Sequence, residues 1–202
     1  TGGDPFTLSD YKLEQIISGI RKISHVSTIR IGTRSVVAAP MRITEELADM
    51  LKKYHPIWIN IQCNHPSEIT PEVEKACDIL QSRGIPVGNQ SVLMKGINND
   101  KEVMKELLLK LIKIRVRPYY LYQCDLVKGT QHFMTSYKEG MEIIRALWGN
   151  ISGYAIPRFV IDVPGKGGKI IVEPSNIIDA DEDSIILRDY EGDAVKYKII
   201  KE

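Results

Sequence analysis

Segments typical of β-strands alternate with segments typical of α-helices, and this alternation restricts the possible folds more than any other feature. Runs rich in β-branched and aromatic residues lie at 26–31, 57–61, 87–93 and 116–122. Apolar residues with a helical spacing lie at 8–23, 99–113 and 136–147, and further helices are expected to begin at Thr44 and Thr70. A strand and then a helix, repeated roughly every 30 residues, is typical of βαβ units around a parallel sheet.

After residue 150 the helical segments stop, and short strand-like runs follow one another. These runs lie at 154–160, 169–172, 184–188 and 194–199, with turn residues at 181–183 and 191–193. We therefore predict a partial (β/α)6 barrel over residues 1–150 and a β-rich C-terminal segment over residues 151–202. Because Thr1-Gly-Gly-Asp4 resembles the end of a strand that enters a loop, we expect the chain to begin inside a domain.

The composition is that of an ordinary globular protein and argues against several classes of partner. Of the 202 residues, 43% are hydrophobic and 26% are charged, and the net charge is +1. So small a net charge gives no electrostatic reason to bind nucleic acid or an anionic membrane surface. No apolar run approaches the roughly 18 residues of a membrane span. The three cysteines, Cys63, Cys77 and Cys124, are too widely spaced for a disulfide framework or a metal motif, so a cytoplasmic protein with reduced thiols is expected.

The stretch from Phe159 to Lys169 combines an apolar run, an acid, a glycine-rich turn and a lysine. The apolar run ends at Asp162, three glycines and a proline follow, and Lys169 leads into a second apolar run. Glycines let the backbone take positive φ and approach a ligand closely. A lysine amine can form a Schiff base with an aldehyde cofactor when a pocket lowers its pKa. The alternative for this stretch is a hairpin turn with a solvated lysine.

A second stretch, Arg115–Asp125, is also apolar and aromatic, and it also ends in an acid. Two carboxylates that converge on one site, here Asp125 and Asp162, can bind an ammonium group by charge-assisted hydrogen bonds. An α/β sheet carries its chemistry at the C-terminal ends of its strands. Candidate polar residues fall at these predicted ends: Asp4, Arg30, Gln62, Asn64, Gln90 and Asp125.

For three tyrosines and one histidine the sequence indicates a role less specifically. Strand alternation predicts Tyr120 and Tyr122 on one face of their strand and Tyr119 on the other. A tyrosine on the inner face can pack against a cofactor or simply fill the core, and both alternatives remain open. His65, which precedes a proline, is expected to fix a loop rather than to bind a ligand.

Together these stretches resemble the lysine 2,3-aminomutase family of radical S-adenosylmethionine enzymes. The resemblance covers nearly the whole chain, in order and with matching spacings. The matching pieces are Thr1-Gly-Gly-Asp4, Arg30-Ile-Gly32, Asn64-His-Pro66, Gly88-Asn-Gln-Ser-Val-Leu93, Lys113-Ile-Arg-Val-Arg-Pro-Tyr-Tyr120, Tyr122-Gln-Cys-Asp125, Ser152-Gly-Tyr154 and Asp162 through Lys169. The fold that it implies is a partial (β/α)6 barrel of the radical S-adenosylmethionine type with a β-rich C-terminal appendage.

The resemblance also implies roles for single residues. Lys169 would hold pyridoxal phosphate, and Asp125 and Asp162 would bind the side-chain ammonium of the substrate. Contacts with S-adenosylmethionine are implied for a glycine motif and a glutamine: Gly2, Gly3, Asp4 and Gln90. Because two carboxylates would repel a third, the presence of both acids favours lysine over glutamate as the substrate.

Several parts of such an enzyme are expected outside these residues. The radical chemistry needs three cysteine thiolates on a Cys-x3-Cys-x2-Cys loop that holds a 4Fe-4S cluster, and this chain has no such loop. The arginines for the cofactor phosphate and the substrate carboxylate are also implied upstream, so we expect the chain alone to be inactive. Gln62 stands where the family often has a histidine, and Asp100 where zinc-binding members have a cysteine. No metal ligand is assigned within the chain.

The implied function is a radical aminomutase that interconverts L-lysine and L-β-lysine by a 2,3-amino shift. Its implied cofactors are S-adenosylmethionine, the 4Fe-4S cluster and pyridoxal phosphate, and its partners are a small amino acid and further copies of itself in a homo-oligomer. The alternatives are an aminomutase for another amino acid, one that supplies β-lysine for modification of a translation factor, and a non-catalytic α/β fragment that only binds ligands.

Overall fold

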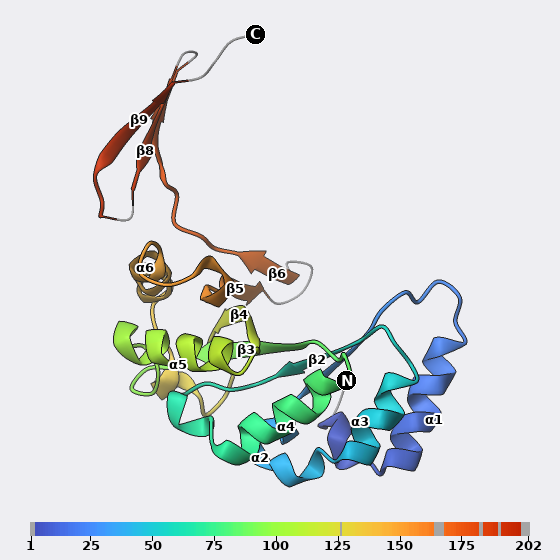
Figure 1. Ribbon diagram of the computed structural model, residues 1–202. Coiled ribbons are helices and arrows are strands. Elements are labelled where there is room, and N and C mark those ends of the chain that lie inside the picture. The colour runs from blue at the N-terminus through green and yellow to red at the C-terminus, as the bar shows by residue number, and fades with distance from the viewer. Residues whose placement is uncertain (1–2, 126, 164–167, 182–183, 190, 199–202) are drawn as a thin grey trace.

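The computed structural model describes residues 3–125, 127–163, 168–181, 184–189 and 191–198 (Figure 1). Its α-helices are α1 Asp10–Arg21, α2 Ser35–Ala38, α3 Glu45–Lys52, α4 Pro71–Ser82, α5 Lys101–Lys113 and α6 Tyr137–Leu147. Its strands are β1 Ile29–Thr33, β2 Ile57–Ile61, β3 Val87–Leu93, β4 Arg117–Gln123, β5 Arg158–Val163, β6 Gly168–Ile171, β7 Ile177–Ala180, β8 Ser184–Arg188 and β9 Ala194–Lys198. Short 3-10 helices lie at Pro5–Thr7, Pro40–Arg42, Pro66–Glu68, Gln131–Phe133 and Gly153–Ala155.

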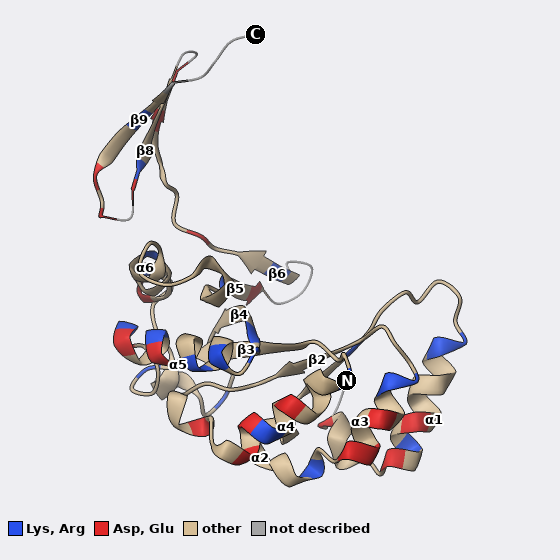
Figure 2. Cartoon of the chain, in the orientation of Figure 1, with Lys and Arg blue, Asp and Glu red and all other residues tan. Residues whose placement is uncertain are grey.

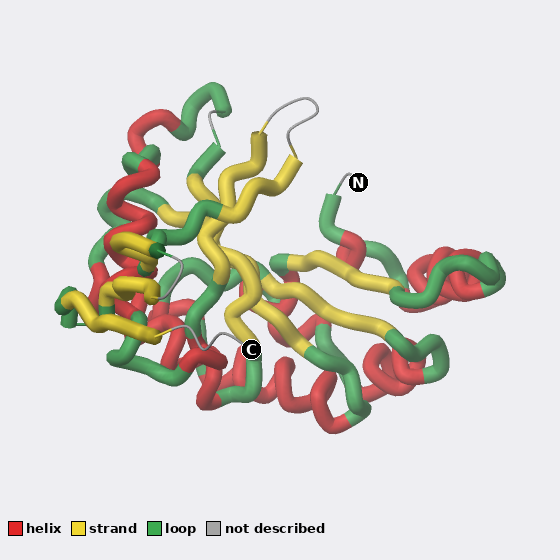
Figure 3. Tube along the Cα trace, turned by 90° about the horizontal axis from the view of Figure 1, so that it is seen from above, coloured by secondary structure: helices red, strands yellow, loops and turns green. Residues whose placement is uncertain are grey.

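Six strands form one curled sheet in the order of the sequence. Strands β1 to β5 are parallel to their neighbours, and β6 returns antiparallel to β5 at the edge. Seen from above, the strands fan around an open interior, with the helices outside them (Figure 3). Each parallel connection carries a helix back across the outer face, as parallel strands require. The predicted partial (β/α)6 barrel with a β-rich appendage is confirmed.

The helices begin at the predicted capping residues, and they cover the outer face of the sheet. The Ser9 and Thr44 hydroxyls accept hydrogen bonds from the backbone in the first turns of α1 and α3, and Thr70 caps α4 ahead of a proline. Both acidic and basic residues lie along α1, α3 and α4 on the outside of the sheet (Figure 2). No helix among the described residues is long and apolar enough to cross a membrane.

The core lies between the outer face of the sheet and these helices. Strand β2 contributes Ile57, Ile59 and Ile61, all fully buried, and α4 contributes five buried residues of its inward stripe: Val73, Ala76, Cys77, Ile79 and Leu80. Burying a large aliphatic side chain contributes about 1.5–3 kcal/mol. Strand β1 shows how alternate residues divide between the two faces of the sheet. Ile29 and Ile31 are buried against the helices, and Arg30 between them is exposed on the inner face.

One part of the predicted alternation is wrong, in strand β4. The register with β3 shifts between Asn89 and Gln90, which pair with Pro118 and Tyr120, so that one extra residue lies on β4. Such a bulge moves two consecutive side chains toward one face. Tyr119 therefore stacks on Tyr120, with ring centroids 3.9 Å apart, and its hydroxyl donates a hydrogen bond to that of Tyr120. All three tyrosines thus share the inner side.

The C-terminal strands form two groups. Strand β5 begins at Arg158, later than predicted, because Ser152 caps a 3-10 turn over 153–155 and Pro157 follows it. Strands β5 and β6 complete the six-stranded sheet, whereas β7, β8 and β9 form a separate antiparallel sheet that extends from the body (Figure 1). Strand β7 and the four-residue helix α2 were not predicted. The division into residues 1–150 and 151–202 as domains stays a prediction.

The carboxylate of Asp4 fastens the N-terminal loop to the carboxyl end of β1. Its Oδ1 accepts hydrogen bonds from the Phe6 amide at 2.9 Å and the Thr33 hydroxyl at 2.7 Å. Its Oδ2 accepts from the amides of Arg34 at 2.6 Å and Ser35 at 3.1 Å. Burial raises the pKa of Asp4, but these four hydrogen bonds outweigh it, and the net pKa is lowered.

We expect Gly140→Ala to destabilise the fold by about 1–3 kcal/mol, because a Cβ in α6 would overlap the buried ring of Phe159. Gly19→Ala is the matched control. Gly19 is an exposed helical residue of α1, and outside its own helix backbone no atom lies within 4 Å of the added methyl. Gly19→Ala should therefore stabilise the folded protein by about 0.5–1 kcal/mol. Urea unfolding of both variants checks this, and an unchanged midpoint for Gly140→Ala would contradict the packing of α6 on β5.

We expect Asp4→Asn to cost about 1–3 kcal/mol at neutral pH, because its amide places a donor against the backbone N–H groups that the lost oxygen accepted. The lowered pKa means that this stability is present above the ordinary pKa of aspartate and is lost as pH falls through the lowered value. The difference from the unsubstituted protein should therefore narrow in acid. Asp100→Asn is the control, since Asp100 caps α5 through Oδ1 alone and asparagine caps equally well. Equal losses in both variants would refute the two-oxygen clamp.

Candidate active site

Lys169 and Asp162 lie opposite each other on the two antiparallel strands at the edge of the barrel sheet. They are register partners in β6 and β5, and Lys169 Nζ is 2.7 Å from Asp162 Oδ2. The hydrogen bond with Asp162 raises the pKa of Lys169, burial acts in the opposite direction, and the neighbouring Tyr122 adds to the rise. The amine is therefore an ammonium at neutral pH, whereas a Schiff base with an aldehyde needs the neutral amine.

Tyr122 and Gln90 extend this contact across the inner face. Lys169 Nζ lies 5.3 Å from the centroid of the Tyr122 ring, and Gln90 Nε2 donates a 3.3 Å hydrogen bond to the Tyr122 hydroxyl. Burial raises the pKa of Tyr122, so its hydroxyl stays neutral at physiological pH. The structure thus joins the tyrosine, whose role the sequence left open, to two residues predicted to bind different cofactors.

Asp125 and Asp162 line one cavity at the carboxyl ends of β4 and β5. The cavity measures about 460 Å³, and its lining residues are Gln123, Cys124, Asp125, Val127, Met134, Ile161 and Asp162. Lys169 is not among these described lining residues, but its ion pair with Asp162 brings it to the edge of the cavity. Two carboxylates and apolar walls in so small a space favour a ligand with a cationic end and an aliphatic chain.

Gln123 is a residue of this cavity that the sequence analysis did not single out. Its Nε2 donates to the carbonyl of Thr135 at 2.7 Å, which fixes the orientation of the amide. Its Oε1 is buried and has no hydrogen-bond partner among the described residues. A buried acceptor without a donor is costly, so other contacts of the packed amide must offset this oxygen. The only signal in the sequence was its position two residues before Asp125.

The N-terminal loop presents backbone rather than a free side chain. The four acceptor positions of the Asp4 carboxylate are all occupied by protein donors, which leaves none for an additional donor. Gly3 has a φ of 42°, a conformation that favours glycine, and its peptide groups can approach a ligand. Gly2 lies outside the described residues. The cofactor roles predicted for this loop stay predictions.

The polar residues after β2 have structural partners. Asn64 Oδ1 accepts a 2.8 Å hydrogen bond from the amide of Val92, which ties β2 to β3. The His65 side chain accepts a hydrogen bond from the amide of Ser67, and the Glu68 carboxylate accepts one from the backbone N–H of His65. The prediction that His65 fixes a loop is confirmed. Gln62 is exposed just beyond the end of β2.

The inner face near the start of the strands is positively charged. A cavity of about 700 Å³ is lined there by Thr28, Arg30, Trp58, Asn60, Val87, Gly88, Arg117 and Tyr119. Neither Arg30 nor Arg158 forms an ion pair with any carboxylate of the described residues. Both arginines act electrostatically on Tyr119 from the inner side. Unpaired guanidinium groups beside aromatic rings suit an anionic ligand.

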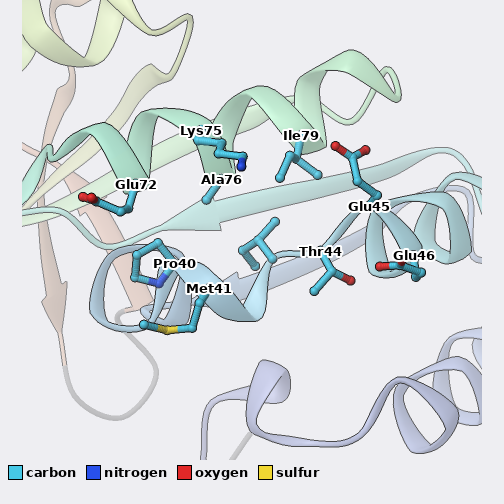
Figure 4. A pocket seen from close by; sticks show the side chains of 10 residues that line it. Pro40, Met41, Thr44, Glu45, Glu46, Glu72, Lys75, Ala76 and Ile79 are labelled. Carbon is cyan, nitrogen blue, oxygen red and sulfur yellow. The ribbon is translucent and has the colours of Figure 1, made fainter.

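A further cavity lies on the outer surface, away from every predicted site residue. It measures about 420 Å³ and is bounded by α4 and the segment that leads into α3 (Figure 4). Glu72 and Lys75 of α4 face Pro40 and Met41 across it. Its walls bring together no set of convergent polar groups, so it offers no chemistry to compare with the barrel interior.

The three cysteines are as far apart in the fold as their spacing suggested, since two follow β2 and β4 and one lies within α4. Cys63, Cys77 and Cys124 are buried and free. Burial raises the pKa of Cys63 and of Cys77 to about 12, and it also raises that of Cys124. Their thiols are therefore protonated at neutral pH, which disfavours both metal binding and nucleophilic roles.

Comparison with known proteins identifies the family. The family model for lysine-2,3-aminomutase matches residues 144–201. The L-lysine 2,3-aminomutase of Clostridium subterminale is 53% identical over 197 residues, which are 98% of this chain and 47% of that protein. The glutamate 2,3-aminomutase of Clostridioides difficile is 50% identical over 196 residues, 97% of this chain and 46% of that protein. The chain thus spans about half the length of the curated relatives it matches.

Among solved structures, Streptococcus suis SuiB bound to S-adenosylmethionine matches with a TM-score of 0.56 and 13% identity, over 80% of this chain and 38% of that one. At this identity the likeness concerns the fold. The sequence similarity covers nearly the whole chain, and the sheet with its strands in sequence order is consistent with it. The chain belongs to the lysine 2,3-aminomutase family, and its sheet is a partial barrel of the radical S-adenosylmethionine type.

Proposed function

We propose that the complete protein interconverts L-lysine and L-β-lysine by a radical 2,3-amino shift. The observation that carries this proposal is the arrangement of Lys169 beside Asp162, with Asp125 and Asp162 on one small cavity. An amine for an aldehyde cofactor and two acids for a substrate ammonium are the groups that this reaction needs on one face. The similarity to L-lysine 2,3-aminomutases supports the same reaction.

The residues present fit pyridoxal phosphate. Lys169 supplies a primary amine on the inner face, and the unpaired Arg30 and Arg158 give that face the positive charge that an anionic cofactor requires. When bound, the cofactor supplies a π-system that stabilises an unpaired electron next to the migrating nitrogen. Tyr122, within reach of Lys169 and Gln90, packs beside the amine and orients it.

S-adenosylmethionine and a 4Fe-4S cluster complete the proposed cofactors. Gly3 and Asp4 lie in the loop fastened to the carboxyl end of β1, and Gln90 lies in the middle of β3, hydrogen-bonded to Tyr122. We assign contacts with S-adenosylmethionine to these three residues and to Gly2. The geometry of Asp4 gives it a positioning role, because its carboxylate holds the glycine loop in place. The cluster ligands are assigned to no residue of this chain.

The two acids define the proposed substrate. Asp125 and Asp162 would bind the side-chain ammonium of lysine by charge-assisted hydrogen bonds. A glutamate side chain would bring a third carboxylate into this cavity and would be repelled. This argument separates the two substrates, whereas overall identity does not, since the glutamate 2,3-aminomutase is nearly as similar as the lysine enzyme.

We also propose a homo-oligomer in the cytoplasm. The separate C-terminal sheet exposes a row of apolar side chains on one face, and Ile177, Val195 and Tyr197 are each at least half exposed. Exposed apolar patches of this kind mark interaction surfaces. The near-zero net charge supports neither nucleic acid nor an anionic membrane as a partner.

We expect borohydride reduction of the complete enzyme with pyridoxal phosphate, followed by peptide mapping, to place the pyridoxyl group on Lys169. The reason is the position of its amine on the inner face beside Tyr122. Lys169→Ala should abolish the label and leave the fold intact, since the side chain is nearly half exposed. A label on Lys166 in the unsubstituted enzyme would refute the assignment.

We expect Asp125→Asn to raise the KM for lysine and to lower kcat/KM by an amount equivalent to about 2–5 kcal/mol, as for truncation of one partner in a desolvated charge pair. Steady-state kinetics of the complete enzyme measure this. Asp78→Asn is the control, because Asp78 pairs with Arg115 on the outer surface, far from the cavity. An unchanged KM and kcat for Asp125→Asn would exclude Asp125 from substrate binding.

A further inference from the structure

The ion pair between Lys169 and Asp162 brings two proposed roles into conflict. Asp162 Oδ2 is already bound to an ammonium group, that of Lys169, at 2.7 Å. The same carboxylate is proposed to bind the ammonium of the substrate. Lys169 in turn must be a neutral amine to attack an aldehyde, and the ion pair holds it protonated. Neither residue can perform its proposed role while they hold each other.

The surroundings of the pair leave Asp162 as the dominant influence on Lys169. Tyr122 of β4 faces the ammonium with its ring, and its hydroxyl stays neutral because burial raises its pKa. Arg30 of β1 acts on Tyr122 from the same side. Asp162 is the carboxylate in hydrogen-bond contact with Nζ among the described residues. The ammonium of Lys169 thus occupies, on Asp162, the position that a substrate ammonium would take.

We infer that Asp162 binds two ammonium groups in turn: that of Lys169 in the protein without its cofactor, and that of the substrate once Lys169 has joined the cofactor. This inference rests on the function proposed above and adds an order of events to it. The bond between Lys169 and the cofactor vacates the ammonium site, so cofactor loading is what prepares Asp162 for lysine. Asp125 forms no ion pair with Lys169 or with any other residue that the structure describes, so the exchange leaves its carboxylate unchanged.

The chemistry of the step is consistent with such an exchange. The ammonium of Lys169 first loses a proton to solvent, and the neutral nitrogen then attacks the aldehyde carbon. A carbon–nitrogen double bond forms, and the carbonyl oxygen leaves as water, so no oxidant or reductant is needed. A lysine ammonium carries three N–H donors, whereas the nitrogen after this step carries at most one. The hydrogen bond to Asp162 Oδ2 is lost or weakened, and the oxygen can turn to the cavity that it already lines.

The inference predicts opposite effects of one substitution on two ligands. Asp162→Asn removes the partner that keeps Lys169 protonated, so the cofactor should react faster at neutral pH. The same substitution removes an acid from the substrate site, so lysine should bind less well. Asp125→Asn should weaken lysine binding in the same way and leave the reaction of Lys169 with the cofactor unchanged. The two acids are therefore matched controls for each other.

The experiment measures the initial rate of pyridoxyl labelling of Lys169 with pyridoxal phosphate and cyanoborohydride in the complete enzyme, as a function of pH. Peptide mapping confirms the residue at each pH. The raised pKa of Lys169 means that its neutral fraction grows only as pH rises through that value. We expect Asp162→Asn to move the rate profile to lower pH and to speed labelling at pH 7 by about twofold to fivefold, the range that an exposed ion pair supports.

The outcomes separate this inference from the function on which it rests. No label on Lys169 in the unsubstituted enzyme would refute the proposed function. A label on Lys169 with the same pH profile in Asp162→Asn would leave that function standing and overturn the exchange. Equal shifts in Asp125→Asn and Asp162→Asn would also overturn it, because they would show a general effect of charge.

Two further measurements guard against a misfolded variant. Asp162→Glu keeps the charge and should keep a profile close to that of the unsubstituted enzyme. In the unsubstituted protein without cofactor, the pKa of Lys169 can be read by NMR after isotope labelling of lysine side chains. A value at or below the ordinary pKa of lysine, about 10.4, would overturn the inference without any substitution.

Discussion

The parallel pairing of β1 to β5 is the constraint on which the rest of this structure depends. Because these strands follow one another in sequence order, right-handed crossovers place every connecting helix on the same face of the sheet. The apolar residues at alternate strand positions turn toward these helices. The other face is left to polar and aromatic side chains. All carboxyl ends then meet at one rim, and this brings the clamp at Asp4 and the cavity of Asp125 to the same end of the barrel. Gln90 lies further down, in the middle of β3, where it is hydrogen-bonded to Tyr122.

Much of the fold could be predicted because local chemistry and tertiary structure agree in most segments. Thr70 followed by Pro71 begins a helix by the same rule in isolation and in the fold, and β2 and β3 start and end at the predicted residues. One failure arose where a distant contact decides. Tyr119 turns inward because of a register shift against β3. The late start of β5 has a local cause instead, since a turn over 153–155 that Ser152 caps replaces the first residues of the apolar run. No periodicity within one strand encodes the register of its neighbour.

The sequence identified most residues of the candidate site, but it did not predict the contacts between them. The resemblance supplied Lys169, Asp125 and Asp162, but it assigned each of them to a ligand and not to a contact within the protein. The hairpin register makes Lys169 and Asp162 direct partners, and this depends on pairing across a turn that sequence spacing leaves open. Asp4 likewise was assigned to a cofactor because of its motif, whereas its hydrogen bonds show a clamp within the protein. Gln123 was missed because the sequence does not show which side-chain oxygens are buried without a hydrogen-bond donor in the folded protein.

The place of β6 at the edge of the sheet has a dynamic consequence. Within the described part of the chain it pairs with β5 alone, through four residue pairs, and no other strand is hydrogen-bonded to its outer edge. The side chains of β6 are exposed, so little apolar burial opposes its separation from the barrel. Lys169 is thus carried on a short segment that can open locally while the parallel core remains folded. A residue so mounted can exchange partners at a small local cost, which a lysine fixed within the central strands could not do.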